Sequence, residues 1–160
     1  MAVLKDNKKL EVNRGIDMEI RTFRNEDISG ICNLINSELG YDVSCEDLKA
    51  RIFQMQEDKN YVIFTAVDNE KIVGFIGLQM CLAFEITGKV MRIIALAVSR
   101  HFQGQGIGSA LIQEAEKYAN ENNISTILVN SGLKRTEAHC FYEKNSFHKK
   151  GYSFCKRIEQ

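Results

Sequence analysis

The sequence predicts a single mixed α/β domain, and three observations support this prediction. A chain of 160 residues, of which 44% are apolar and 26% charged, has the composition of a globular protein and can bury one sizeable core. Segments with the two-residue period of strands alternate with segments that have the period of amphipathic helices. Their order is β-α-α-β-β-β-α-β-α-β, and no repeat or low-complexity stretch interrupts it.

The beginning of the chain predicts an arm and an opening strand. Residues 1–15 are polar and lysine-rich without a clear period, so we expect an N-terminal arm there and the folded domain over residues 16–160. Residues 18–23, "MEIRTF", alternate apolar and polar side chains in the way that a half-buried strand does.

Two helices are expected next. Asn25 or Asp27 can cap the first helix, and Ser44 with Asp47 three positions later resembles a capping box at the start of the second. The residues expected to face the core are Ile28, Ile31, Leu34 and Ile35 in the first helix and Leu48, Ile52 and Met55 in the second.

The rest of the chain predicts strands broken by two helices. The segments "YVIFTAV" and "IVGFIGLQM" flank the turn "DNEK" and predict a β-hairpin, "CLAFEITGK" contains a second turn, and "VMRIIALAV" is a further strand. A long helix follows Gly106, then a buried strand, "STILVNS", and a short helix that Thr136 caps and Lys144 ends. A strand, "GYSFCKRI", closes the chain. The long helix should bury Ile107, Leu111, Ile112, Ala115, Tyr118 and Ala119.

Composition excludes several classes of function. Lys and Arg number 21, as do Asp and Glu, so the basic surface that nucleic-acid binding requires is not expected. No apolar run approaches the roughly 20 residues of a membrane span, and no signal-peptide pattern opens the chain. We therefore expect a soluble, cytoplasmic protein with neither a nucleic-acid nor a membrane partner.

The cysteines indicate free thiols. Their number is odd, and none forms a C-x-x-C pair, so a disulfide framework or a metal site is not expected. No neighbouring residue in the sequence activates any of them as a nucleophile. The five are Cys32, Cys45, Cys81, Cys140 and Cys155.

A glycine-rich segment, "RHFQGQGIGSAL", lies between a buried strand and the long helix. Gly104, Gly106 and Gly108 permit a tight turn, but one turn rarely needs three glycines. Bare backbone at this position leaves N–H groups exposed beside the positive end of the helix dipole. We therefore favour a phosphate-binding loop over a turn alone.

Two nucleotide-binding loops do not fit this segment. A P-loop ends in Gly-Lys-Ser/Thr, and "GIGSAL" has no lysine. A dinucleotide loop requires Gly or Ala where Ser109 stands, and it requires an acid at the end of the next strand, where Asn130 stands. A nicotinamide-dependent oxidoreductase is disfavoured on both counts.

The remaining match is Q/R-x-x-G-x-G/A, formed by Gln103, Gly106 and Gly108, and it resembles the acetyl-CoA pyrophosphate loop of the GNAT superfamily of N-acetyltransferases. A second segment, "RTEAHCFYEKNSF", resembles that family's helix A-x-x-F/L-Y-E-K and the G-F pair after it. The resemblance covers roughly residues 18–156. It implies the GNAT fold, in which helices flank a mixed, mostly antiparallel central sheet.

The sequence departs from the family's common pattern at three positions. Gln103 replaces a frequent arginine, Arg135 stands where many members have a cofactor-binding asparagine, and Ser146 replaces the usual glycine. The segment from Arg135 to Tyr142 resembles a subgroup with members that acetylate small amines, so we interpret the departures as subtype variation.

The resemblance implies direct transfer of acetyl from acetyl-CoA, the cosubstrate, to a primary amine, without a metal. Tyr142 is the expected acid for the leaving thiolate, and Glu85 is the expected base or amine ligand, although a solvated glutamate at a turn is equally compatible with the sequence. The residues expected to bind the cosubstrate are Leu96, Ala97, Val98, Gln103, Gly104, Gln105, Gly106, Ile107, Gly108, Ser109, Asn130, His139 and Phe141.

The acceptor is expected to contact the segment between the first two helices, "NSELGYDVSCED", and the residues around Phe84. Acids in that segment suit a cationic amine, but Glu46 and Asp47 are also explained by the helix dipole. A small-molecule amine is the favoured acceptor, and a homodimer is compatible with the resemblance. The alternative is a non-catalytic acyl-CoA-binding module on the same fold.

Overall fold

The computed structural model describes residues 8–12 and 16–158, which fall into two compact units that meet between Leu128 and Val129. In the first unit the elements are β1 (Lys8–Val12), β2 (Ile16–Thr22), the 3-10 turn η1 (Asn25–Asp27), α1 (Ile28–Leu39), α2 (Cys45–Glu57), β3 (Tyr61–Asp68), β4 (Lys71–Ala83), β5 (Ile86–Val98), η2 (Arg100–Phe102) and α3 (Ile107–Glu121). The strand β6 (Ile127–Val129) spans the boundary, and α4 (Thr136–Lys144) lies in the second unit.

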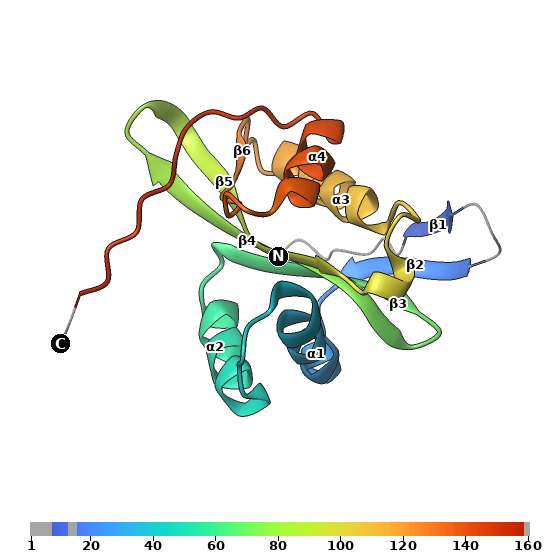
Figure 1. Cartoon of the computed structure of the whole chain (residues 1–160). Helices are drawn as coiled ribbons and strands as arrows, with labels where there is room; N and C mark the ends of the chain where they lie inside the picture. The colour runs from blue at the N-terminus through green and yellow to red at the C-terminus, as the bar shows by residue number, and fades with distance from the viewer. Residues whose placement is uncertain (1–7, 13–15, 159–160) are drawn as a thin grey trace. The chain divides into compact units, whose positions relative to one another are not determined.

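The strands form one sheet in the order β1-β2-β3-β4-β5-β6 (Figure 1). Each neighbouring pair from β1 to β5 is antiparallel, with Ile20 opposite Ala66 and Phe64 opposite Ile76. Short turns join β3 to β4 and β4 to β5, as the alternating patterns predict, whereas the connection from β2 to β3 contains α1 and α2. The structure therefore confirms a mixed α/β domain with a mostly antiparallel sheet.

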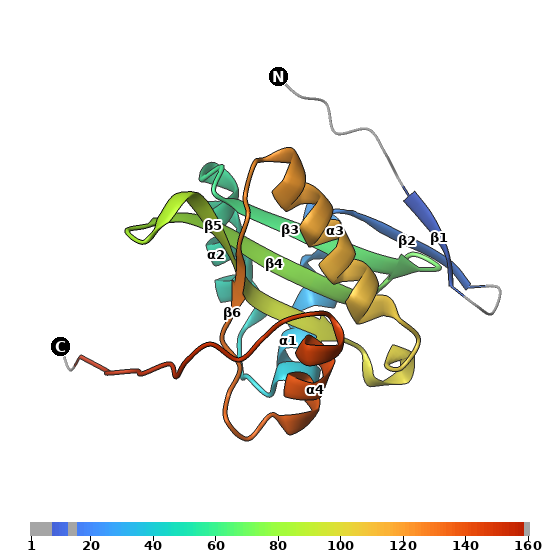
Figure 2. The ribbon, with the colours of Figure 1, turned by 90° about the horizontal axis from the view of Figure 1, so that it is seen from above.

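The two faces of this sheet are covered by different helices, as Figures 1 and 2 show for α1 and α2 on one side and α3 on the other. On the first face, one apolar cluster joins both helices to the sheet: Ile28, Ile31, Cys32, Leu34, Leu48, Ile52, Phe75 and Ala97. On the second face, Tyr118 of α3 lies edge-on to Phe64, with ring centroids 5.9 Å apart. Each large apolar side chain buried in this way contributes about 1.5–3 kcal/mol.

The helix faces predicted from the sequence are nearly all correct. Ile28, Ile31 and Leu34 are buried in α1, and Leu48 and Ile52 are buried in α2. In α3, all the expected residues except Tyr118 are buried, and Ala110 joins them. The three-to-four-residue spacing alone specifies which side of each helix faces the sheet.

The predicted caps are correct for one helix only. Ser44 Oγ accepts a hydrogen bond from Asp47 N at 3.1 Å, which confirms the N-terminus of α2. Asp27 instead uses its carboxylate to accept hydrogen bonds from Arg21 and from Arg24 N, at 2.7 to 2.8 Å, so its side chain is not free to cap α1. Thr136 is the first residue of α4, and Arg135 occupies the N-cap position.

The expectation of free thiols is wrong for two cysteines. Cys32 of α1 and Cys45, the first residue of α2, form a disulfide. Their 13-residue separation gave no sign of it, but the turn between the helices brings their Cα atoms within 5.6 Å. Cys81, Cys140 and Cys155 are free thiols.

The strands differ from the prediction at both ends of the chain. Residues 8–12, expected within the arm, form β1 and pair with β2. The expected closing strand, "GYSFCKRI", is absent: the structure describes all of residues 147–158 and assigns them no helix or strand. Three of its large apolar side chains, Tyr152, Phe154 and Ile158, are 74–92% exposed. Apolar alternation forms a strand only where a partner edge supplies hydrogen bonds. Across residues 8–12 and 16–158, no helix is long and apolar enough to span a membrane.

Candidate active site

The glycine-rich segment forms an open loop between η2 and α3. Gly104 and Gly106 have φ angles of 75° and 86°, a left-handed conformation that side chains other than glycine's disfavour. A Cβ built on either residue meets no atom within 4 Å, so the space in front of both is open. Both φ angles are consistent with the sequence prediction that this loop needs glycine.

The side chains of the two glutamines of the loop form hydrogen bonds with the backbone next to it. Gln103 Nε2 donates to Val98 O at 2.9 Å, and Gln105 Nε2 donates to His101 O at 3.1 Å. Both side chains therefore hold the loop to the end of β5 and to η2. Because these side chains bond to the protein itself, the backbone N–H groups are the principal donors that the loop offers to a ligand.

The N-terminus of α3 adds donors beside the loop. The first hydrogen bond within the helix runs from Ala110 N to Gly106 O at 2.9 Å, so the N–H groups of Ile107, Gly108 and Ser109 have no partner in the helix. No side chain of the described residues caps this end. Ile107, which is 2% exposed, anchors the first turn in the core. A pyrophosphate fits this set of donors, since the N–H groups and the helix dipole both favour an anion.

The strand before the loop has a local irregularity at Ile94. Gly77 pairs with Ala95 and Leu78 with Ile93, so Ile94 is an extra residue in β5 that bulges from the ladder. A bulge interrupts pairing and redirects backbone groups, and bulges are frequent beside active sites. The sequence gave no signal for it, because the apolar run is continuous through this point.

Leu96, Ala97 and Val98 follow the bulge and pair with β4 on one side, opposite Ile76, Phe75 and Gly74. On the other side, β6 has only 3 residues against 13 in β5. Met91 N donates to Thr126 O at 3.0 Å, so the residue just before β6 lies beside Met91. The three residues of β6 are too few to reach from there to Leu96, whichever way the strand runs. β6 therefore does not cover β5 at these residues: the N–H groups of Leu96 and Val98 remain for another hydrogen-bonding partner, whereas Val98 O already accepts from Gln103 Nε2.

In the second unit, Tyr142 of α4 lies half-buried among aromatic rings. The ring centroids of Phe141 and Phe147 are 5.3 and 5.5 Å from that of Tyr142. Burial raises the pKa of the Tyr142 phenol, and the charge of Arg135 opposes the shift only in part. The phenol is therefore protonated at neutral pH, as a proton donor must be.

The turn after α4 places Ser146 in a backbone conformation that glycine adopts more easily. Ser146 has a φ of 65°, a left-handed conformation that costs most residues about 1–2 kcal/mol. This conformation lets Phe147 N donate to Tyr142 O at 3.0 Å and so ends the helix. Ser146 thus keeps the geometry of the usual glycine.

The other predicted residues of the second unit lie along its loop. His139 is 3.0 Å from Gly132 O through a ring nitrogen, and Asn130 Nδ2 donates to Ser153 Oγ at 3.4 Å. Ser131 Oγ is buried without a hydrogen-bond partner among the described residues. That hydroxyl, with the exposed Asn130, can bond the amides of a bound ligand.

The structure places Glu85 far from the predicted site residues at the end of β5. Glu85 is an exposed residue in the turn between β4 and β5, whereas Leu96 is eleven positions further along β5. A strand rises by about 3.3 Å per residue, so the two are on the order of 30 Å apart. The sequence prediction relied on the position of Glu85 in the chain, which does not show how long this hairpin is.

The acceptor segment is linked to the loop by an ion pair that the sequence did not predict. Glu38 at the end of α1 lies with Oε2 3.7 Å from Nε of Arg100, the first residue of η2. Glu38 is 11% exposed and Arg100 is 69% exposed. The contact places the segment after α1 beside the start of the glycine-rich loop and partly neutralises one of its acids.

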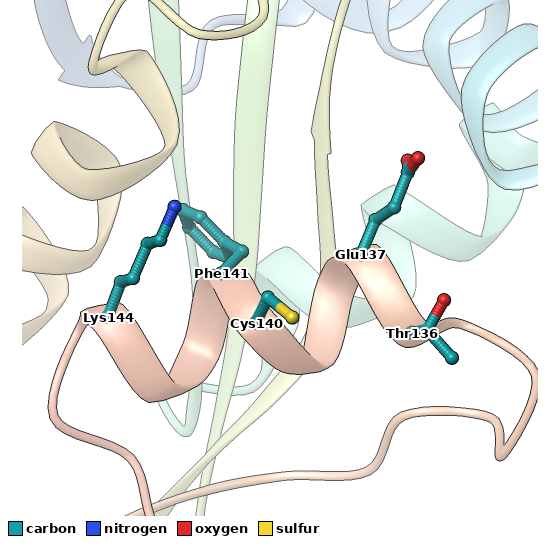
Figure 3. A pocket seen from close by; sticks show the side chains of 5 residues that line it. All are labelled: Thr136, Glu137, Cys140, Phe141 and Lys144. Atoms are coloured by element: carbon teal, nitrogen blue, oxygen red, sulfur yellow. The ribbon is translucent and has the colours of Figure 1, made fainter.

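A separate hollow of about 390 Å³ lies on α4. Figure 3 shows the five side chains that line it, all of which project from that helix: Thr136, Glu137, Cys140, Phe141 and Lys144. Phe141 is the only predicted site residue in its lining, and Tyr142 is not part of it. Its lining therefore carries the carboxylate of Glu137 and the ammonium of Lys144, but not the phenol that the sequence predicts as the acid.

Comparison with known proteins identifies a family of similar sequences. The sequence profile of the Acetyltransferase (GNAT) family matches residues 28–147. An aminoalkylphosphonate N-acetyltransferase of Salmonella typhimurium is 28% identical over 128 residues, which are 80% of each chain. An N-alpha-acetyltransferase of Schizosaccharomyces pombe is 27% identical over 122 residues, 75% of this chain and 77% of the relative.

Solved structures share the fold. The crystal structure of a GNAT family acetyltransferase from Staphylococcus aureus has a TM-score of 0.75 and 25% identity, and covers 88% of this chain and 98% of its own. An aminoglycoside N-acetyltransferase in complex with CoA has a TM-score of 0.80 at 14% identity, over 93% and 99% of the two chains. At that identity the second likeness shows the fold alone.

Proposed function

Because the chain belongs to the Acetyltransferase (GNAT) family, we propose that it transfers acetyl directly from acetyl-CoA to the primary amine of a small molecule in the cytoplasm. The observation that carries the proposal is the open loop with left-handed Gly104 and Gly106 in front of the uncapped start of α3. The N–H groups at this helix start and the helix dipole both favour an anion such as a pyrophosphate, which supports the proposal.

In this proposal the backbone N–H groups of the loop and of Ile107, Gly108 and Ser109 hold the pyrophosphate. The bound cosubstrate supplies an activated thioester. The free edge of β5 at Leu96, Ala97 and Val98 offers hydrogen bonds to it, including one to the carbonyl oxygen on which negative charge develops. Such a preorganised donor is typically worth about 3–4 kcal/mol of barrier.

Tyr142 is the proposed acid for the departing thiolate. Its phenol is protonated at neutral pH because burial raises its pKa. An acid in this role contributes about 10²–10⁴-fold to turnover. Glu85 has no part in the proposal, since the turn that carries it lies too far along the hairpin from Leu96.

The named relatives support an amine as acceptor. Both the aminoalkylphosphonate N-acetyltransferase and the N-alpha-acetyltransferase are named for acetylation at nitrogen. The first acts, by its name, on a small molecule, and it matches the larger share of this chain. A small-molecule amine is therefore the acceptor that we propose.

The test is calorimetric titration of the whole chain with acetyl-CoA, beside NAD and ATP. Two variants sharpen it: Gly106→Ala and Gly88→Ala. Both glycines have nearly the same φ, 86° and 87°, and open space where a Cβ would stand, so the backbone strain is matched. We expect Gly106→Ala to weaken acetyl-CoA binding at least tenfold by obstructing the loop, and Gly88→Ala, in the distant hairpin, to leave binding unchanged.

Equal affinity in the two variants would place the pyrophosphate elsewhere. If acetyl-CoA binds, thiol release is then followed with a panel of primary amines. Tight binding without release of thiol for any amine would identify the chain as a non-catalytic acyl-CoA-binding module.

A further inference from the structure

Three polar side chains form a row across the middle of the sheet. Tyr61 of β3 pairs with Gln79 of β4, and Gln79 pairs with Arg92 of β5. Directly paired residues of antiparallel strands point to the same face, with Cβ atoms about 5 Å apart. The three side chains are therefore neighbours on one surface.

The row lies on the face that α1 and α2 cover. The side chains of a strand alternate between faces, so Ile63, Gly77 and Ala95, in the next row on the same face, share the side of Tyr61, Gln79 and Arg92. Ile63 and Ala95 pack against the cluster built by α1 and α2. This is also the side on which the acceptor segment joins the two helices.

Two members of the row are already oriented. Gln79 Nε2 donates to Tyr61 OH at 2.8 Å in a partly buried position. The hydroxyl of Tyr61 accepts in this bond and retains its own proton for donation. A donor is thus presented from β3 on the same face as the cation on β5, with Gln79 of β4 between them.

The positive charge of the row is on Arg92. Its side chain is half-buried, yet within residues 18–158, whose side chains the structure describes, it makes no ion pair. Taking a guanidinium partly out of water is costly unless an anion or hydrogen-bond acceptors compensate. The guanidinium presents a planar set of donors that matches an oxyacid group.

The row is at a useful distance from the proposed reaction centre. Arg92 precedes Leu96 by four positions, with the bulged Ile94 between them. At about 3.3 Å per residue their Cα atoms are at most roughly 13 Å apart, and a long side chain shortens this gap. A small molecule whose amine and acid groups are separated by a few bonds can span the remainder.

We propose that Arg92, Gln79 and Tyr61 form an anion subsite for the acceptor, which is a small primary amine that also carries an oxyacid group. This inference rests on the proposed function. It differs from the expectation of a cationic amine, which the acids of the segment "NSELGYDVSCED" had suggested. Of those acids, Glu38 is already matched to Arg100.

The first experiment measures binding independently of turnover. 2-Aminoethylphosphonate, β-alanine and ethylamine are titrated calorimetrically into the whole chain, with and without saturating CoA. We expect saturable binding of the phosphonate or the carboxylate and none of ethylamine at the same concentration. The two anionic probes distinguish a tetrahedral from a planar acid group. If ethylamine binds as well as both, the proposal is overturned.

The second experiment assigns the binding to Arg92. Arg92→Gln should weaken binding of the anionic amine at least tenfold. Arg92→Lys should recover part of the affinity, because lysine keeps the positive charge but lacks the bidentate donors of a guanidinium. Arg51→Gln is the matched control, since Arg51 is an exposed residue of α2 and its loss removes the same charge. Equal weakening in the Arg51 and Arg92 variants would refute the subsite.

Kinetics separates this inference from the proposed function. In Arg92→Gln, the KM for the anionic amine should rise while acetyl-CoA affinity is unchanged, which also shows that the variant is folded. Failure of the wild-type chain to bind acetyl-CoA would remove the proposed function, whereas the calorimetric titration without CoA would still test the anion subsite. Loss of acetyl-CoA affinity in Arg92→Gln would contradict a role limited to the acceptor.

Discussion

At the residue scale, Tyr142 shows how local burial prepares a side chain for proton donation. The rings of Phe141 and Phe147 surround the phenol, and burial raises its pKa above the ordinary value of about 10. A raised pKa leaves the phenol protonated over the whole neutral range. The same shift makes the folded state lose stability as the pH rises above the pKa of the unfolded chain, because only the unfolded phenol then ionises readily.

Replacement of Tyr142 by phenylalanine keeps the ring and removes the acid. We expect turnover in Tyr142→Phe to fall by about 100-fold or more, with acetyl-CoA affinity unchanged. Thiol release and calorimetry measure the two quantities. Because the folded pKa is raised, the wild-type rate should show no loss attributable to this group between about pH 7 and 9, and should decline only above about 10. Undiminished turnover in the variant would remove Tyr142 from the role.

At the scale of elements, the connection between α1 and α2 is held by several bonds. Asn36 of α1 exchanges two hydrogen bonds of 2.9 Å with the backbone of Val43. The disulfide between Cys32 and Cys45 joins α1 to the start of α2. Since this connection belongs to the predicted acceptor segment, its rigidity bears on acceptor binding as well as on stability.

The disulfide predicts a difference in stability between oxidised and reduced protein. A cross-link closing a loop of this size contributes about 3 kcal/mol. Cys45→Ser should therefore lower the free energy of unfolding in urea by about that amount and abolish its dependence on reductant, whereas Cys81→Ser, which removes a free thiol, should keep that dependence. In a reducing cytoplasm the pair is held as thiols, so the stabilised form belongs to oxidising conditions.

Alkylation of the native protein gives an independent check. Without reductant, the exposed Cys140 and Cys155 should be labelled and the Cys32–Cys45 pair should not. Labelling of Cys45 in the untreated protein would show that the cross-link is absent.

The elements themselves were largely predictable. Apolar spacing identified α1, α2 and α3 and the residues that each buries, and alternation identified β2, β3 and β4. The spacing in helices and the alternation in strands each involve side chains that are only a few positions apart in the sequence. The closing strand failed because alternation in residues 151–158 states which side chains are apolar, but not whether an edge is available to pair with them.

At the scale of the molecule, the exposed end of the chain predicts an unequal effect of two similar substitutions. Phe154 is 92% exposed and Phe75 is 3% exposed. Phe154→Ala should change the free energy of unfolding by less than about 0.5 kcal/mol. Phe75→Ala, which empties the core between the sheet and α1, should cost about 3–5 kcal/mol. Urea unfolding of the two variants measures both changes. A large loss of unfolding free energy in Phe154→Ala would mean that residues 151–158 are packed against other residues in solution.

By itself, the sequence determined the fold class, the order of most elements and the position of the glycine-rich loop. Those properties depend on periodicity and on backbone conformations that few residues allow, and both are local. Only the tertiary structure decided the bulge at Ile94, the pairing of Cys32 with Cys45, the distance of Glu85 from Leu96 and the row that contains Arg92. Each of these depends on strand register or on the path of a turn, which arises from contacts between residues far apart in the chain.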